Sequence, residues 1–156
     1  MYRDDPIPED EHAKWFPSTE FDTNNSRYRI AELDSVPVGW MGLTRIESRH
    51  RSCEWGGYLS PDAPKGVGLG KALVCLSLEM AFEDLRLNRV VVEVLVGNTR
   101  ALGLYESLGF VRESRLRQRA WLSSGPQDAF GLSMLAGEWN SLRQIHLESL
   151  RVSGVI

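Results

Sequence analysis

The chain has 156 residues, of which 42% are hydrophobic and 25% charged, proportions typical of a globular domain long enough for one core. A formal net charge of −3 argues against nucleic acid as the main partner, and two cysteines with three histidines show no zinc-ligand spacing. The N-terminus is acidic, and no apolar run approaches the about 20 residues of a membrane span, so we expect a soluble, cytoplasmic protein with no membrane partner. We also expect one domain over residues 1–156 and no metal.

The N-terminal half of the chain predicts a short helix followed by three strands. Pro8 to Phe16 carries acidic residues in its first turn, which favours a helix, and Pro17 limits its continuation. Strands are expected at Arg27 to Leu33, Val38 to Ile46 and Cys53 to Leu59, which turn-forming or polar segments separate. The short connections predict an antiparallel meander.

A change of hydrophobic period marks a long helix from Gly68 to Leu85. Leu69, Leu73, Leu76 and Met80 recur at helical spacing, so we expect them to share one face turned toward the core.

The next segments predict a strand, a helix and a hairpin. Arg89 to Val96 is a β-branched run typical of a central strand that is covered on both faces. Asn98 to Leu108 is a predicted helix, with Gly109 as its left-handed stop. Two strands, near Phe110 to Gln118 and Asp128 to Leu135, flank a turn of sequence SSGP.

The order of these elements predicts an α/β fold on one mixed sheet. A partly helical tail from Glu138 to Ile156 completes the chain. Neighbouring strands of such a sheet diverge at a splay, and ligands settle in crevices of that kind. The two cysteines, Cys53 and Cys75, are expected to be buried as small apolar side chains.

A glycine-rich segment, KGVGLGKA, lies between the third strand and the long helix. Its glycines allow the backbone to turn sharply and approach a ligand, and the free N–H groups of the first helical turn favour an anion such as a pyrophosphate. Lys65 and Lys71 add positive charge beside it. The spacing matches neither the Walker motif nor the Rossmann fingerprint, and a glycine-rich helix start without a ligand is the alternative.

A second cluster, EVLVGNTRALGLYESLGF at residues 93–110, follows the β-branched strand. The pair K-x-x-G-x-G-K-A and N-x-x-A-x-x-x-Y-E-x-x-G-F, one strand apart, resembles the GNAT superfamily of acetyl-CoA-dependent N-acetyltransferases. The resemblance implies a mixed, mostly antiparallel sheet with a central splay, flanked by helices, whose glycine-rich loop holds the CoA pyrophosphate. Lys65 stands where the family usually has Gln or Arg. The residues that the resemblance implies for acetyl-CoA are Tyr58, Leu59, Ser60, Lys65, Gly66, Val67, Gly68, Leu69, Gly70, Lys71, Ala72, Asn98, Ala101 and Tyr105.

The same resemblance implies the catalytic groups. Tyr105 is placed to protonate the departing CoA thiolate, and its alternative role is a core aromatic with a hydrated hydroxyl. Glu93, inside VVVEVLV, is the expected base for the acceptor amine, because an unpaired carboxylate is costly to bury. A structural ion pair of Glu93 with Arg89 or Arg45 is the alternative, and Glu54 is a second candidate base.

Several further polar or aromatic residues have two interpretations. Asn98 caps the second helix, which is compatible with a cofactor contact. Trp40 and Trp55 are expected in the core rather than stacked on a ligand. The alternating arginines of one strand are expected to form a basic stripe, either solvated or docking an anionic acceptor or a nucleotide diphosphate. These arginines are Arg112, Arg115, Arg117 and Arg119. At a period of two residues, the last three point to one face of the strand and Arg112 points to the other.

A narrower resemblance covers about 140 residues. Four segments are similar, in order, to bacterial nucleotide-sugar acetyltransferases, which act on the 4-amino group of a UDP-linked amino sugar in pseudaminic acid biosynthesis. They are MYRDDPIPEDEHAKWF, VGWMGLTRI, CEWGGYLS and the segment from residue 109 to residue 135. This places Tyr2, His12 and Phe16 toward the sugar nucleotide, although for His12 a solvated surface position is favoured. In such enzymes a strand and a helix precede the segment like Met1–Tyr2. Since both are absent from this sequence, we expect either a homodimer covering Arg27 to Leu33 or an upstream extension of about 30 residues.

The sequence therefore predicts acetyl transfer from acetyl-CoA to a primary amine, with a nucleotide-linked amino sugar as the acceptor. Direct attack in a ternary complex is expected, because neither motif contains a cysteine to form an acyl-enzyme. The alternatives are an acetyltransferase for protein N-termini or other small amines, and a catalytically inactive CoA-binding module.

Overall fold

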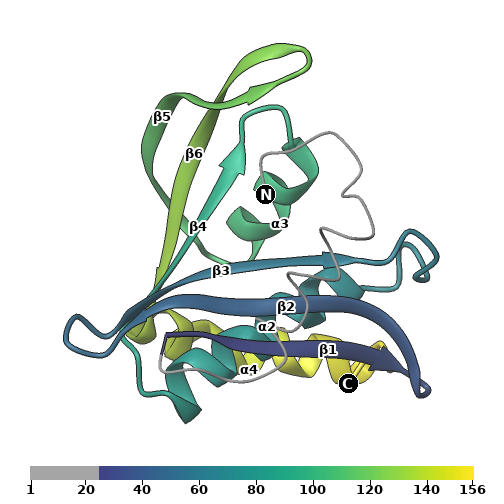
Figure 1. The fold of residues 1–156 in the computed structure, drawn as a ribbon. Helices are drawn as coiled ribbons and strands as arrows, with labels where there is room; N and C mark the ends of the chain where they lie inside the picture. Colours follow the sequence, from purple (N-terminus) through teal and green to yellow (C-terminus); the bar gives the residue numbers. More distant parts are fainter. Residues whose placement is uncertain (1–24) are drawn as a thin grey trace.

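The computed structural model describes residues 25–156, and this part of the chain forms one six-stranded sheet with helices packed on it (Figure 1). The strand order is β1-β2-β3-β4-β6-β5. The strands are β1 (Arg27–Leu33), β2 (Val36–Glu47), β3 (Ser52–Leu59), β4 (Arg89–Leu95), β5 (Val111–Leu122) and β6 (Gly125–Leu135). The helices are α2 (Leu69–Glu79), which continues as the π-helical turn η1 (Met80–Asp84), α3 (Thr99–Ser107) and α4 (Ala136–Val152). The helix predicted at Pro8 to Phe16, with Tyr2, His12 and Phe16, lies outside the described residues.

Strand pairing confirms the mixed, mostly antiparallel sheet. All neighbouring strands are antiparallel except β3 and β4, which are parallel. Their pairing extends only over Ser52–Glu54 of β3 and 89–91 of β4. Beyond these residues the two strands diverge like the arms of a V, with α3 beside the opening (Figure 1).

The predicted meander is confirmed, and β1 has the predicted bounds. β2 begins two residues earlier than expected, because Val36 pairs with Leu33 across a tight turn. Within the described residues β1 pairs only with β2, so it is an edge strand of this sheet. Homodimer formation over that edge stays a prediction.

The predicted hairpin forms, but both strands are longer than expected. β5 reaches Leu122 and β6 begins at Gly125, so the turn consists only of Ser123 and Ser124. The pairing of Leu122 with Gly125 extends the ladder into the segment that the sequence assigned to the loop.

One face of the sheet carries the hydrophobic core. On β4, Val90, Val92 and Val94 are buried, whereas Glu93 between them is exposed. The core continues onto α2, the C-terminal end of α3 and α4. Its fully buried side chains there include Leu78 of α2, Leu108 at the C-cap of α3 and Trp139 of α4. The prediction that β4 is covered on both faces is therefore wrong at Glu93.

The long helix buries a wider face than predicted. Leu69, Leu73 and Met80 are buried as expected, but Leu76 is 46% exposed, so its expected place in the core is wrong. Because α2 packs against both the sheet and α4, its buried side chains also include Val74, Cys75, Ser77 and Leu78.

The predicted partly helical tail is a continuous helix, α4, fixed across α2. Trp139 is fully buried, and its Nε1 donates to Oε1 of Glu79 on α2 at 2.6 Å. Arg143 Nε donates to the same oxygen at 3.1 Å. The partly buried Glu79 carboxylate thus accepts two hydrogen bonds from α4, and these bonds fix the position of α4 along α2. No helix within residues 25–156 is both long and apolar enough to cross a membrane.

Candidate functional site

The site forms around the splay between β3 and β4. Ser60 N–H donates to Val38 O of β2 at 2.8 Å, so its N–H is already engaged. Since N–H groups alternate in direction along a strand, those of Leu59 and Gly57 point away from β2 and into the opening. Of the three β3-end residues expected to contact acetyl-CoA, Tyr58, Leu59 and Ser60, Leu59 therefore offers a backbone donor to the opening. Gly57, which the sequence reasoning did not single out, offers another.

The glycine-rich loop has the conformation that the sequence predicted. Gly66 and Gly68 have φ values of 80° and 92°, in the left-handed region where a side chain adds strain. Gly68 is the N-cap of α2, and the first helical bond runs from Ala72 N–H to Gly68 O at 3.0 Å. Among the described residues no side chain caps this helix start, and its first turn has no acidic residue, so the preceding amides are oriented to meet an anion.

The loop, the end of β3 and α3 converge at Gly70. A Cβ added there would lie 3.6 Å from Leu104 of α3 and 3.9 Å from Leu59 of β3. The structure thus brings together the three segments that the resemblance assigned to one cofactor. Lys71 extends toward α4, where its Nζ donates to Ser149 Oγ at 3.2 Å.

We expect the substitution Gly68→Val to lower CoA affinity at least about tenfold. The positive φ would cost a side chain about 1–2 kcal/mol, so the turn that aims the helix amides would deform. Isothermal titration with CoA measures this effect. Gly137→Val is the matched control, because Gly137 lies in the first turn of α4, has no positive φ, and an added Cβ would have no described residue within 4 Å. Equal CoA affinity in both variants would contradict the pyrophosphate assignment.

The second motif is also built as predicted. Asn98 caps α3, since its Oδ1 accepts from Ala101 N–H at 3.1 Å. Gly109 ends the helical segment with a φ of 96°, the expected left-handed stop. The cap fixes the start of α3 beside the opening, next to the end of β4 (Figure 1).

Tyr105 lies on the face of the sheet that carries the core, beside the opening between β3 and β4. It is 7% exposed, and its ring meets those of Trp55 and Phe110 edge-on, with centroids 5.7 and 5.2 Å apart. Burial raises the pKa of the Tyr105 phenol. A phenol in this environment keeps its proton at neutral pH, as a general acid requires.

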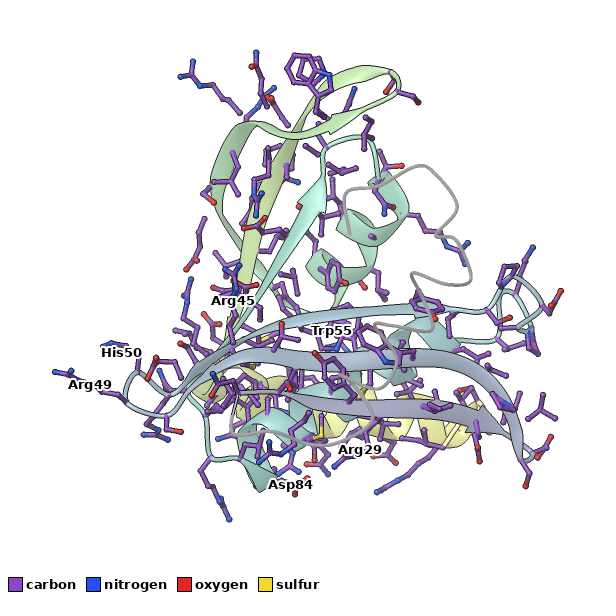
Figure 2. All side chains as sticks on the ribbon, in the orientation of Figure 1. Arg29, Arg45, Arg49, His50, Trp55 and Asp84 are labelled. Atoms are coloured by element: carbon purple, nitrogen blue, oxygen red, sulfur yellow. The ribbon has the colours of Figure 1, made fainter. Side chains whose placement is uncertain are left out.

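Trp55 is the first residue of β3 beyond the part that pairs with β4, where the splay begins (Figure 2). As predicted, it packs against the core. Its buried Nε1 has no hydrogen-bond partner among the described residues, a feature that no sequence pattern predicted. Trp40 is not a core residue: it stacks between Tyr28 and Tyr58, with ring centroids 5.5 and 5.9 Å away.

The two candidate bases lie on the opposite face of the sheet from Tyr105. Glu93 Oε2 accepts from Arg119 Nε at 2.8 Å, and Glu54 Oε1 accepts from Arg45 Nη1 at 3.0 Å. Arg45 is visible near the base of the V (Figure 2). The suggested pairing of Glu93 with Arg89 or Arg45 is wrong.

Arg89 instead binds Glu113, which lowers the pKa of that carboxyl. The correct partner of Glu93, Arg119, is 26 positions away in the sequence and meets it only after the hairpin folds back.

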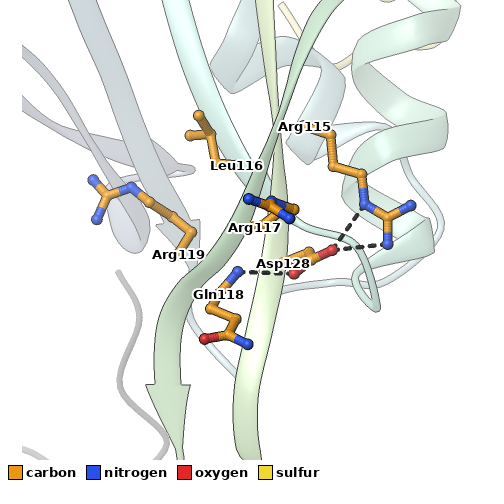
Figure 3. Close-up of a pocket in the computed structure, with 6 residues that line it drawn as sticks. All are labelled: Arg115, Leu116, Arg117, Gln118, Arg119 and Asp128. Carbon is orange, nitrogen blue, oxygen red and sulfur yellow. Dashed lines mark hydrogen bonds and ion pairs between the residues drawn. The ribbon is translucent and has the colours of Figure 1, made fainter.

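The arginines of β5 do not form the single stripe that the sequence predicted. Register shifts between Arg112 and Ser114 and between Leu116 and Ala120 interrupt the period of two. Arg112 binds Glu106 and lies over the Phe130 ring, whereas Arg115 binds Asp128. Figure 3 shows Arg115 and Arg119 extending to opposite sides of the hairpin. A depression of about 660 Å³ lies here, lined by Arg115, Leu116, Arg117, Gln118, Arg119 and Asp128.

No group of His, Cys, Asp or Glu side chains in the described part of the chain is arranged to hold a metal ion. Cys53 and Cys75 are free and buried, as expected for small core side chains. Burial raises the pKa of each thiol to about 12, so neither is a thiolate at neutral pH.

Comparison with known proteins gives a consistent picture. The family model for the acetyltransferase (GNAT) domain matches residues 1–111. Spermidine N(1)-acetyltransferase of Vibrio cholerae is 27% identical over 76% of this chain and 68% of its own length. The putative ribosomal N-acetyltransferase YdaF of Bacillus subtilis is 29% identical over 68% of this chain, which spans 57% of that relative. Acetyltransferase PseH of Campylobacter jejuni is 28% identical over 65% of this chain and 60% of its own length.

The fold has close structural matches as well. The crystal structure of the Vibrio cholerae spermidine N-acetyltransferase in complex with CoA and spermine superposes with a TM-score of 0.79 at 26% identity. The match covers 88% of this chain and 81% of that structure.

Proposed function

Because this chain belongs to the GNAT acetyltransferase family and is an acetyl-CoA-dependent N-acetyltransferase, we propose that its acceptor is the primary amine of a nucleotide-linked amino sugar, specifically the 4-amino group. The observation that carries the proposal is the splay, with Tyr105 on one face of the sheet and two carboxylates on the other. A carboxylate on one face of the sheet would thus accept the proton of the amine, and Tyr105 on the other face would protonate the leaving thiolate.

The cofactor would enter along the glycine-rich loop. Its pyrophosphate would meet the amides of residues 66–71, since the Ala72 N–H is bonded to Gly68 O, and its pantetheine arm would pair with the free edge of β3 at Gly57 and Leu59. Tyr58, Ser60, Asn98 and Ala101 would border the same path. The thioester would then lie in the opening, near Tyr105.

Acetyl transfer would proceed by direct attack. The free amine of the acceptor attacks the thioester carbonyl carbon, a C–N bond forms, and the C–S bond breaks. A carboxylate, Glu93 or Glu54, takes the proton of the amine, and Tyr105 gives its proton to the thiolate of CoA. The raised thiol pKa of Cys53 and Cys75, both buried, argues against a cysteine acyl-enzyme.

Charge favours an anionic acceptor over a polycation. Glu54 and Glu93 are each engaged by an arginine. The neighbouring depression is lined by three arginines, one of which is the Arg119 that engages Glu93, and by one aspartate. A nucleotide diphosphate complements such a surface, whereas a polyamine is repelled by it.

A polyamine acceptor is the second candidate. The relatives named as spermidine N-acetyltransferases, including the structure in complex with CoA and spermine, favour it. On the chain itself, Glu54 and Glu93 would have to release their arginines to bind a polycation.

The acceptor class is tested by release of free CoA thiol from acetyl-CoA. The panel contains UDP-linked 4-amino sugars, spermidine, spermine and a peptide with a free N-terminus. We expect the highest kcat/KM with a UDP-linked amino sugar. Faster turnover of spermidine would indicate a polyamine acceptor instead. Faster turnover of the peptide would indicate an N-terminal acetyltransferase. Absence of turnover with every acceptor, together with intact CoA binding, would indicate a CoA-binding module.

A further inference from the structure

The outer half of the β5–β6 hairpin carries a concave basic surface that acetyl transfer itself does not use. We call it the hairpin depression and define it by the six lining residues given above (Figure 3). Its volume of about 660 Å³ falls within the range of small-molecule sites.

A β-bulge creates this depression. Between Leu116 and Ala120 the register shifts, and Gln118 has a φ of 50° in the left-handed region. Gln118 N–H donates to Asp128 Oδ1 at 2.8 Å, and Asp128 Oδ2 accepts from Arg115 Nε at the same distance. These bonds lower the pKa of Asp128, the Gln118 contact being the largest cause. The bulge is therefore held by an ionised carboxylate rather than by ladder hydrogen bonds.

The arginines of the depression are not equivalent. Arg115 is bound to Asp128, and Arg119 to Glu93. Arg117, between them, forms no ion pair with a described residue. A guanidinium offers five N–H donors in a planar fork that matches a phosphate group. Arg117 is thus a cation available for a ligand, flanked by two cations of fixed position.

An aromatic surface adjoins these charges. Trp121 is 76% exposed, more than any other aromatic side chain within residues 25–156. Trp121 follows Ala120, the first residue of β5 that is paired again beyond the bulge, and is two positions along the chain from Arg119. Their Cα atoms are about 7 Å apart along the strand. An exposed indole beside arginines combines a stacking surface with phosphate ligands.

The depression is also connected to the catalytic opening. Arg119 lines it and at the same time binds Glu93, on the strand that forms one arm of the V. A ligand anchored at the hairpin would therefore extend toward the candidate base.

We propose that the hairpin depression binds a nucleoside diphosphate, with the phosphates on Arg117 and its flanking arginines and the base stacked on Trp121. This proposal rests on the proposed function, since it names the part of the acceptor that the hairpin holds.

Calorimetric titration with UDP tests the proposal, with the protein saturated with CoA so that the cofactor site is filled. We expect UDP to bind, and Trp121→Ala to weaken it about 5- to 100-fold through lost base stacking. Arg117→Gln should weaken UDP and inorganic pyrophosphate alike by about tenfold or more. Arg49→Gln, which removes an exposed arginine of the distant β2–β3 turn, is the control and should leave UDP affinity unchanged (Figure 2).

Two results would overturn the proposal: UDP affinity unchanged in Trp121→Ala and Arg117→Gln, or pyrophosphate binding as tightly as UDP. The thiol-release panel distinguishes failure of the hairpin proposal from failure of the proposed function. Turnover of a UDP-linked amino sugar that neither variant impairs would refute the hairpin site alone. UDP binding at the hairpin without turnover of any amino sugar would refute the acceptor alone.

Discussion

We expect Tyr105→Phe to lower kcat by about 10²–10⁴-fold while acetyl-CoA affinity stays within about twofold. The ring packs edge-on against Trp55 and Phe110, contacts that phenylalanine preserves. The substitution therefore removes little beyond the hydroxyl. If that hydroxyl protonates the thiolate only as the C–S bond breaks, its loss raises the energy of the transition state and not of the ground state.

Measurements of kcat, of acetyl-CoA affinity and of the melting temperature distinguish this role from a structural one. A structural hydroxyl would cost about 1 kcal/mol of stability and leave the rate nearly unchanged. Phe110→Leu is the control, because it perturbs the same aromatic cluster without touching the hydroxyl. Near-normal turnover of Tyr105→Phe with a lowered melting temperature would leave the catalytic acid unassigned.

The pH dependence provides a second check on the same residue. Burial raises the pKa of Tyr105 above its usual value near 10, so the phenol stays protonated through the ordinary alkaline range. The kcat of the unmodified enzyme should accordingly show no loss of a catalytic acid below about pH 10.

Local signals in the sequence were sufficient for most of the framework. Arg27–Leu33 alternates between two turn-forming segments, and β1 has those bounds. Asn98 and Gly109 predicted the two ends of α3, because a cap and a left-handed stop depend on residues within one or two turns. Gly66 and Gly68 predicted a left-handed loop for the same reason.

Features that depend on distant neighbours were not predictable in this way. Leu76 fits the helical period, but which side of α2 is covered depends on how the sheet and α4 pack around it. A bulge adds residues to one strand without changing its composition, so alternation alone placed Arg115, Arg117 and Arg119 on one face. The partner of Glu93 likewise depends on the register of the hairpin, which sets Arg119 opposite β4.

The buried indole nitrogen of Trp55, which has no hydrogen-bond partner within residues 25–156, is another feature that depends on distant neighbours. Its position at the start of the splay follows from where the parallel pairing of β3 and β4 stops. The segment Cys53 to Leu59 has the pattern of an ordinary strand, and no residue in it indicates where β4 diverges from β3.

The identity of the base is the remaining question of mechanism, and we expect Glu93→Gln to lower kcat/KM by about 10²–10⁴-fold at neutral pH. An acceptor amine with a pKa near 8, the value of an α-amino group, is largely protonated there and needs a group to take its proton. Glutamine keeps the shape of the side chain and its hydrogen bond to Arg119, but it does not accept a proton. Glu54→Gln should have a smaller effect, because Glu54 lies within the paired part of β3, before the strands diverge.

Alkaline pH separates a base from a residue that only positions the site. Above the pKa of the amine the acceptor is already deprotonated, so the deficit of Glu93→Gln should shrink as pH rises, whereas a positioning defect should persist. Glu113→Gln is the matched control, since it breaks a comparable ion pair, to Arg89, at the closed end of the sheet. A larger deficit in Glu54→Gln that alkaline pH restores would instead make Glu54 the base. A deficit in Glu93→Gln that is the same at every pH would restrict Glu93 to holding Arg119, and with it the hairpin, beside the opening.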